Sequence, residues 1–183
     1  MPTTAESPTW IGEALTRFEG PLLRYAARLT GSLDQARDVV QETFLRLCQA
    51  DRQRVDGHLA EWLYTVCRNR AYDLHRRARH QVPMDDEQLL WHPAPGPGPD
   101  ELVARRDAMA VAWRLLEKLP PRQQEVVRLR FQGGLSYAEI SRVTGASVGH
   151  VGLLLHQAIR ALRDALQEAP VQSSLRGADH DAH

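Results

Sequence analysis

A segment rich in proline and glycine divides this chain of 183 residues into two parts. Residues 82–100 read VPMDDEQLLWHPAPGPGPD, and the five prolines among them are excluded from a helix interior. A stretch of this composition is extended and semi-stiff, which is typical of a linker. We therefore predict two small domains, residues 10–81 and 101–168, that need not touch. The polar residues 169–183 are predicted to form a disordered tail.

Both parts show helical periodicity. Apolar residues recur three and four positions apart, whereas strict alternation of apolar and polar residues hardly occurs, so the fold is predicted to be all-α. The predicted boundaries in the N-terminal part are a cap at Thr9, a break or kink at Gly20-Pro21, an end at Gly31, a cap at Ser32, a polar stretch over 51–57 and a helix over about 59–79.

The helix that follows Ser32 carries an acidic outer face. Asp34, Asp38 and Glu42 are four residues apart, so they stack on one side of the helix, with Gln41 and Leu45 beside them. Like charges at this spacing oppose helix formation, so a purely structural helix gains nothing from them. We interpret this face as a docking surface for a basic protein. Ion pairs with arginines of the same helix are the alternative.

The predicted helix over 59–79 combines aromatic residues with arginines. Trp62 and Tyr64 come first, and the polar residues that follow are Arg68, Asn69, Arg70, Asp73, Arg76 and Arg77. This combination suits single-stranded nucleic acid, because its bases stack on flat rings and its phosphate backbone follows positive charges. The alternatives are a Trp62 that belongs to the core and a basic face that is merely solvated.

In the C-terminal part, two capped helices flank a glycine. Ser136 with Glu139 forms a capping box, Gly145 marks the turn, and Ser147 caps the next helix. This order is typical of a helix-turn-helix, whose second helix presents its outer face to a DNA major groove. Upstream arginines are candidates for phosphate contacts, or for a solvated face; they are Arg122, Arg128, Arg130 and Arg142.

The second helix of this motif has an unusual outer face. Its buried stripe is predicted to start at Val151, and Leu154 and Ile159, which flank the stripe, are expected in the core. Leu153 lies about 200° from Val151 and points outward. An outward leucine here has three alternative explanations. It is a harmless exposed residue, it packs on a partner protein that masks the DNA surface, or it contacts a thymine methyl group in the major groove. In the third case Gln157, beside it, would read the edge of an adenine.

Composition excludes several classes of function. Basic and acidic residues balance at 23 each, no apolar run is long enough to span a membrane, and no secretory signal is visible at the start of the sequence. Cys48 and Cys67 are too few and too isolated for a zinc site, so both are expected to be structural thiols. No HExxH, GxSxG or P-loop occurs. The sequence predicts a cytoplasmic protein that is not an enzyme and has neither cofactor nor metal.

Three stretches in this order resemble one family, the extracytoplasmic-function (ECF) group of bacterial RNA polymerase sigma factors. They are DQARDVVQETFLRL, EWLYTVCRNRAYDLHRR and LPPRQQEVVRLRFQGGLSYAEISRVTGASVGHV, within about residues 15–167. The resemblance implies a sigma region 2-like bundle and a sigma region 4-like helix-turn-helix domain. It also implies that the chain binds core RNA polymerase and promoter DNA, and family habit adds an anti-sigma factor as a possible partner.

The resemblance also implies roles for individual residues. Polymerase docking falls on Asp38, Gln41, Glu42 and Leu45. Contacts to the melted minus-ten element fall on Arg54, Trp62, Arg68, Asn69, Asp73, Arg76 and Arg77. Minus-thirty-five contacts fall on Arg142, Ser147, His150, Leu153, His156, Gln157 and Arg160. The sequence departs from the family where members usually carry Lys and Arg, because Gly152, Leu153 and Leu154 stand there. A stand-alone helix-turn-helix regulator is the alternative, although it leaves the acidic face and the aromatic–arginine helix without a role.

Overall fold

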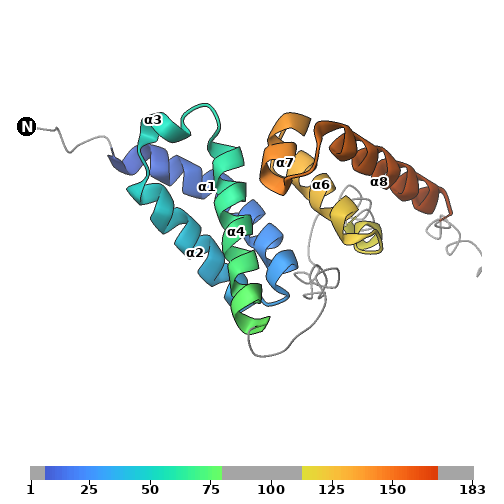
Figure 1. Ribbon diagram of the computed structural model, residues 1–183, viewed down its shortest axis with the longest axis horizontal. Helices are drawn as coiled ribbons and strands as arrows, with labels where there is room; N and C mark the ends of the chain where they lie inside the picture. The colour runs from blue at the N-terminus through green and yellow to red at the C-terminus, as the bar shows by residue number, and fades with distance from the viewer. Residues whose placement is uncertain (1–6, 80–112, 169–183) are drawn as a thin grey trace, which may run out of the picture.

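The computed structural model describes residues 7–79 and 113–168, and every regular element in those ranges is a helix (Figure 1). The N-terminal half contains α1 (Ser7–Thr30), α2 (Leu33–Gln49), α3 (Arg52–Val55) and α4 (Leu59–Arg79). The C-terminal half contains α6 (Pro121–Phe131), α7 (Tyr137–Thr144) and α8 (Val148–Glu168). The all-α prediction is confirmed. The predicted linker and tail lie outside the described residues.

Helix α1 runs through the position where a break or kink was predicted. It begins at Ser7, before the predicted cap at Thr9, and continues across Pro21 to Thr30. Proline forfeits one backbone hydrogen bond, but its fixed φ is helical, so packing can hold the helix together. Leu22 and Tyr25, just after the proline, are almost completely buried. Gly31, in the left-handed conformation with φ 70°, ends the helix where predicted.

Local side-chain caps set the next boundaries. The Ser32 hydroxyl accepts a hydrogen bond from the backbone N–H of Gln35 and starts α2 as predicted. The stretch predicted to be polar and irregular contains the short helix α3. Asp51 caps it by accepting from the N–H of Gln53, and the helix buries Val55. Burial of Val55 anchors this turn to the core.

The core of the N-terminal half lies where α1 packs against α2 and α4. Leu47, Leu63 and Cys67 have no exposed surface. Burial raises the pKa of the Cys67 thiol to about 12, although the hydroxyl of Thr43 acts in the opposite direction. Cys48 is exposed, so of the two cysteines predicted to be structural thiols only Cys67 lies in the core. The neighbouring Leu47 takes the inward position of that helical turn.

The C-terminal half follows the predicted helix-turn-helix pattern. Ser136 and Glu139 form both hydrogen bonds of the capping box, and Gly145 adopts φ 75° at the turn. On α8, Val151 and Leu155 are buried, and Leu154 is only 9% exposed. Ile159 is 39% exposed, so its predicted place in the core was wrong. It lies on the rim of the stripe, where no neighbouring helix covers it fully.

The two halves are in contact, although the linker composition did not require it. Helix α4 packs against α7 (Figure 1). Between α6 and α7, Gly133 lies so close to α4 that an added Cβ would be 2.8 Å from the ring of Tyr64. Tyr64 in turn meets Tyr25 edge-to-face, with ring centroids 5.1 Å apart. Helices from both parts of the chain therefore share one packed surface.

Candidate polymerase and nucleic-acid interfaces

The acidic face of α2 points away from the core. Asp38, Gln41 and Leu45 are exposed, with half of the Leu45 surface accessible. Glu42 is partly buried and pairs with Arg46 at 3.0 Å. Asp34 forms a similar pair with Arg37, at 3.3 Å. Such exposed pairs within one helix contribute only a few tenths of a kcal/mol, so they leave the face available to a stronger partner.

The predicted minus-ten residues fall into two groups. Arg54 on α3 and Asn69 and Arg77 on α4 are exposed to solvent. Arg76 is also exposed and donates to Asp73 on the same helix, at 2.7 Å. Trp62 is partly buried against the core, as its alternative interpretation expected.

Arg68 belongs to a buried polar cluster between the two halves. Its Nε donates to the Glu125 carboxylate at 2.9 Å, and the Tyr25 hydroxyl donates to the same oxygen at 2.9 Å. The Arg68 guanidinium also lies over the ring of Tyr72, 4.5 Å from its centroid. Burial is the largest influence and would lower the pKa of Arg68, but the charge and hydrogen bond of Glu125, together with Tyr72 and Tyr25, outweigh it and raise that pKa. The arginine therefore stays charged in this site.

The same carboxylate affects the tyrosines around it. Burial, and then the negative charge of Glu125, raise the pKa of Tyr25 well above its usual value. The same two causes raise the pKa of Tyr72 to about 12. Tyr25 is therefore a neutral hydrogen-bond donor at physiological pH. Glu125 and Tyr25 were not singled out as functional from the sequence, since nothing local marks two polar residues 100 positions apart as partners.

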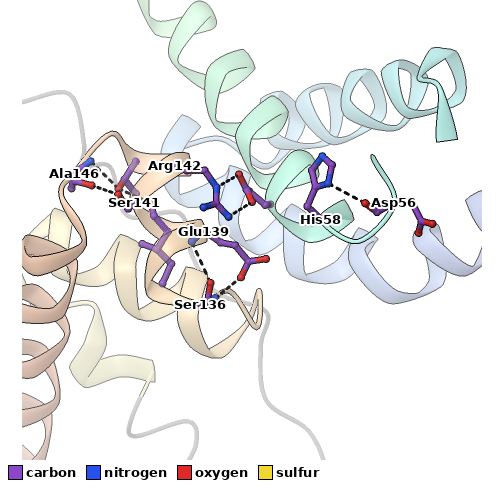
Figure 2. A network of polar contacts seen from close by, with 10 residues as sticks. Asp56, His58, Ser136, Glu139, Ser141, Arg142 and Ala146 are labelled. Atoms are coloured by element: carbon purple, nitrogen blue, oxygen red, sulfur yellow. Dashed lines mark hydrogen bonds and ion pairs between the residues drawn. The ribbon is translucent and has the colours of Figure 1, made fainter. Parts of the chain in front are cut away.

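A second polar contact joins the helix-turn-helix to the start of α4. Arg142 donates through Nε and Nη2 to the two oxygens of Glu61, at 2.7 and 2.8 Å. Figure 2 shows Arg142 beside the capping box of Ser136 and Glu139, close to the loop that carries Asp56 and His58. The hydrogen bonds to Ser136 lower the pKa of Glu139. A bidentate arginine–carboxylate pair has a fixed geometry, so Arg142 has a defined place against α4.

The outer face of α8 presents mostly uncharged groups. His150, Leu153, His156, Gln157 and Arg160 are all exposed. Leu153 is 50% exposed, which confirms its predicted outward direction. Gln157 accepts a hydrogen bond from Gln123 of α6 at 3.3 Å. The Ser147 hydroxyl accepts from the N–H of His150 at 3.2 Å, so it serves as a helix cap.

One predicted phosphate-contacting arginine is inside the protein. Arg128 is 5% exposed, so it cannot reach DNA from this position. Its guanidinium lies 5.4 Å from the centroid of the Trp113 ring. Burial, together with the nearby Arg28 and Arg24, lowers its pKa to about 10. Six consecutive residues of α6 are buried, so this stretch has no exposed face that sequence periodicity could reveal.

Comparison with known proteins identifies the family. The Sigma-70 region 2 family model matches residues 15–81, and the Sigma-70 region 4 model matches residues 110–162. The ECF RNA polymerase sigma factor SigL of Mycobacterium tuberculosis (strain ATCC 25618 / H37Rv) is 39% identical over 154 residues, which cover 82% of this chain and 85% of SigL. This chain belongs to the ECF sigma factors.

Other relatives agree. The ECF sigma factor SigE of Mycolicibacterium smegmatis (strain ATCC 700084 / mc(2)155) is 31% identical over 163 residues, which cover 88% of this chain and 63% of SigE. The fold is similar to that of the sigma factor RpoE from Bartonella quintana, solved in complex with the anti-sigma factor NepR. That likeness has a TM-score of 0.61 at 23% identity, over 87% of this chain and 98% of RpoE.

The family sets the general function. As an RNA polymerase sigma factor, this protein acts in promoter recognition, and α1 to α4 belong to region 2 while α6 to α8 belong to region 4. Sigma factors regulate transcription and are not its catalysts. Within residues 7–79 and 113–168, no helix is long and apolar enough to cross a membrane.

Proposed function

We propose that this sigma factor uses three separate surfaces during initiation. The exposed face of α2 docks on core polymerase, α3 and α4 contact the melted minus-ten element, and the outer face of α8 contacts the minus-thirty-five element. The observation that carries the proposal is the outward direction of Asp38, Gln41 and Leu45, which leaves an acidic and apolar face without a partner inside the described residues. An acidic face of this kind fits a basic partner surface.

The proposal extends to organisation and partners. The two domains span residues 10–81 and 101–168, and residues 82–100 link them. The chain is non-catalytic and works in the cytoplasm, where promoters and polymerase are found. The RpoE–NepR complex supports an anti-sigma factor as a further partner of this chain.

The test reverses two charges on α2. In the variant Asp38→Arg with Glu42→Arg, affinity for core polymerase should fall by about 2–5 kcal/mol, because each new arginine would face a basic surface. The matched control is Glu13→Arg with Glu19→Arg, which changes the net charge equally at exposed positions of α1. Its affinity should stay near that of the wild type.

A stability measurement distinguishes a loss of docking from a loss of fold in this variant. The reversal removes the Glu42–Arg46 pair and places like charges side by side, which costs a helix about 0.5–1 kcal/mol in total. Circular dichroism should therefore show a folded variant with a slightly lower Tm. Wild-type affinity for core polymerase in this folded variant would contradict the proposed docking surface.

A further inference from the structure

A small cavity lies between α1 and α6, and the proposed function makes no use of it. Tyr25 and Arg28 line it from α1, and Gln124, Glu125 and Arg128 line it from α6. The volume of this cavity is about 20 Å³. Because about 10–15 Å³ is enough to hold one water molecule, the cavity has room for one water molecule or one monatomic ion.

Two arginines of this cavity carry buried hydrogen-bond donors that meet no acceptor within residues 7–79 and 113–168. The donors are Nε of Arg128, a residue that is 5% exposed, and Nη1 of Arg28. The ring of Trp113 attracts the Arg128 cation, with its centroid 5.4 Å away, but it leaves the Nε–H group unpaired. A buried donor of a charged group is costly to leave unpaired, which indicates that the cavity takes an acceptor.

The charges around the cavity do not balance. Glu117 pairs with Arg28, and Glu125 pairs with Arg68. Arg128 has no carboxylate partner in the part of the chain that the structure describes. Three arginines and two carboxylates therefore leave an excess of one positive charge beside the cavity. A buried charge without a counter-charge is unfavourable, and one monovalent anion would neutralise this excess.

Two further features make the cavity more positive. Burial, and then the charges of Arg28 and the exposed Arg24, lower the pKa of Arg128 to about 10, so its guanidinium is still protonated at physiological pH although its neighbours repel it. Pro121 and Gln124 belong to the first turn of α6 and also line the cavity. The N-terminal end of a helix carries a partial positive charge, which favours an anion there.

We propose that this cavity is a binding site for a small monovalent anion, chloride, which accepts hydrogen bonds from Nε of Arg128 and Nη1 of Arg28. A water molecule would also accept these hydrogen bonds, but it would not neutralise the excess charge. A tetrahedral oxyanion such as phosphate is too large for a cavity with room for one atom. Volume, unpaired donors and charge therefore agree on a monatomic anion.

An anion that binds only the folded protein stabilises it in proportion to the logarithm of its concentration. The stability of this protein should therefore depend on which anion is present, even when the ionic strength is constant. Scanning calorimetry on the full chain compares 0.2 M sodium chloride with 0.2 M sodium gluconate, an anion too large for the cavity. For a dissociation constant of about 20 mM, the Tm should be about 3–5 °C higher in chloride.

A pair of matched variants separates this site from general salt effects. Arg128→Met removes the Nε donor and the excess charge while keeping an apolar side chain of similar length against Trp113, so the difference between chloride and gluconate should fall below about 1 °C. Arg163→Met removes one positive charge from an exposed position of α8 and should keep the wild-type difference. An equal response to chloride in the two variants would overturn the proposal.

A second measurement uses the wild-type protein and does not depend on the folding of a variant. Bromide replaces chloride in such sites and scatters X-rays anomalously. Crystals equilibrated with 0.2 M sodium bromide should show an anomalous peak in the cavity, within hydrogen-bonding distance of Nε of Arg128 and Nη1 of Arg28. A cavity without an anomalous peak, whether empty or filled by water, overturns the anion site.

Discussion

The substitution Gly133→Ala tests how closely the turn after α6 is packed, both within its own half and against Tyr64 of α4. The added Cβ would lie 2.7 Å from the backbone oxygen of Leu129, 2.7 Å from a methyl carbon of Leu135 and 2.8 Å from the ring of Tyr64. The Leu135 methyl can rotate away, but the Leu129 oxygen belongs to the last turn of α6 and cannot move cheaply. Overpacking of this kind costs about 1–3 kcal/mol.

The expected change in melting temperature follows from that free-energy cost. Each kcal/mol shifts the Tm of a 60–100-residue domain by about 4–8 °C, so Gly133→Ala should lower the Tm of the C-terminal half by at least about 4 °C. Gly12→Ala is the matched control, since no atom lies within 4 Å of its added Cβ inside α1. There, alanine should stabilise the helix by about 0.5–1 kcal/mol.

A double-mutant cycle measures how much of this loss of stability comes from the contact with Tyr64 in the N-terminal half. Tyr64→Leu removes the ring that meets position 133, so Gly133→Ala should cost at least about 0.5 kcal/mol less in that background. Scanning calorimetry on the four proteins gives the coupling free energy. An alanine variant as stable as the wild type, or a coupling free energy of zero, would refute the idea that Gly133 packs on Tyr64.

Four further predictions concern DNA contacts and thiol chemistry. Leu153→Ala should weaken binding to the natural promoter by about 1 kcal/mol at one base pair, without a change in salt dependence; a randomised minus-thirty-five library that shows no position affected would exclude base contact. Arg76→Ala with Arg77→Ala should weaken binding to a pre-melted promoter and reduce the salt slope by about 1–2, and an unchanged slope would mark both arginines as solvated only. With its pKa raised to about 12, the buried Cys67 thiol should stay protonated and resist alkylation in the native protein at pH 8, where only Cys48 reacts. Because the folded pKa of Cys67 exceeds the unfolded value of about 8.5, its contribution to stability is complete below that pH and should be lost progressively between about pH 8.5 and 12; urea titrations that show no such loss relative to Cys67→Ala would contradict this.

Local chemistry explains which features the sequence could predict. The caps at Ser32 and Ser136 and the turn at Gly145 depend on residues within four positions of each other, so their patterns are visible in the sequence. The outward direction of Leu153 follows from helical geometry alone. The family roles of the acidic and basic faces followed from resemblance, and the contacts of those faces with polymerase and DNA stay predictions.

Tertiary packing decides the features that local patterns could not predict. Pro21 was expected to break or kink α1, and the predicted break is absent because Leu22 and Tyr25, just after the proline, are buried in the core. Arg128 was expected on the surface and is buried, whereas Ile159 was expected in the core and is exposed. Residues from other segments of the chain decide both outcomes. The Arg68–Glu125 pair joins residues 57 positions apart, across a segment whose composition says nothing of their contact.

The order of the helices along the chain means that the N-terminal core is synthesised before the C-terminal half. Helices α1, α2 and α4 pack on one another to form the N-terminal core, and every helix of that core has been synthesised once Arg79 has left the ribosome. At about 5–20 residues per second, about 4–18 s of synthesis separate Arg79 from Glu168. During that interval α4 has no α7 against it, and the nascent chain presents Arg68 and Glu61 uncovered. We expect the nascent chain to expose the surface of α4 that its own C-terminal half covers in the finished protein.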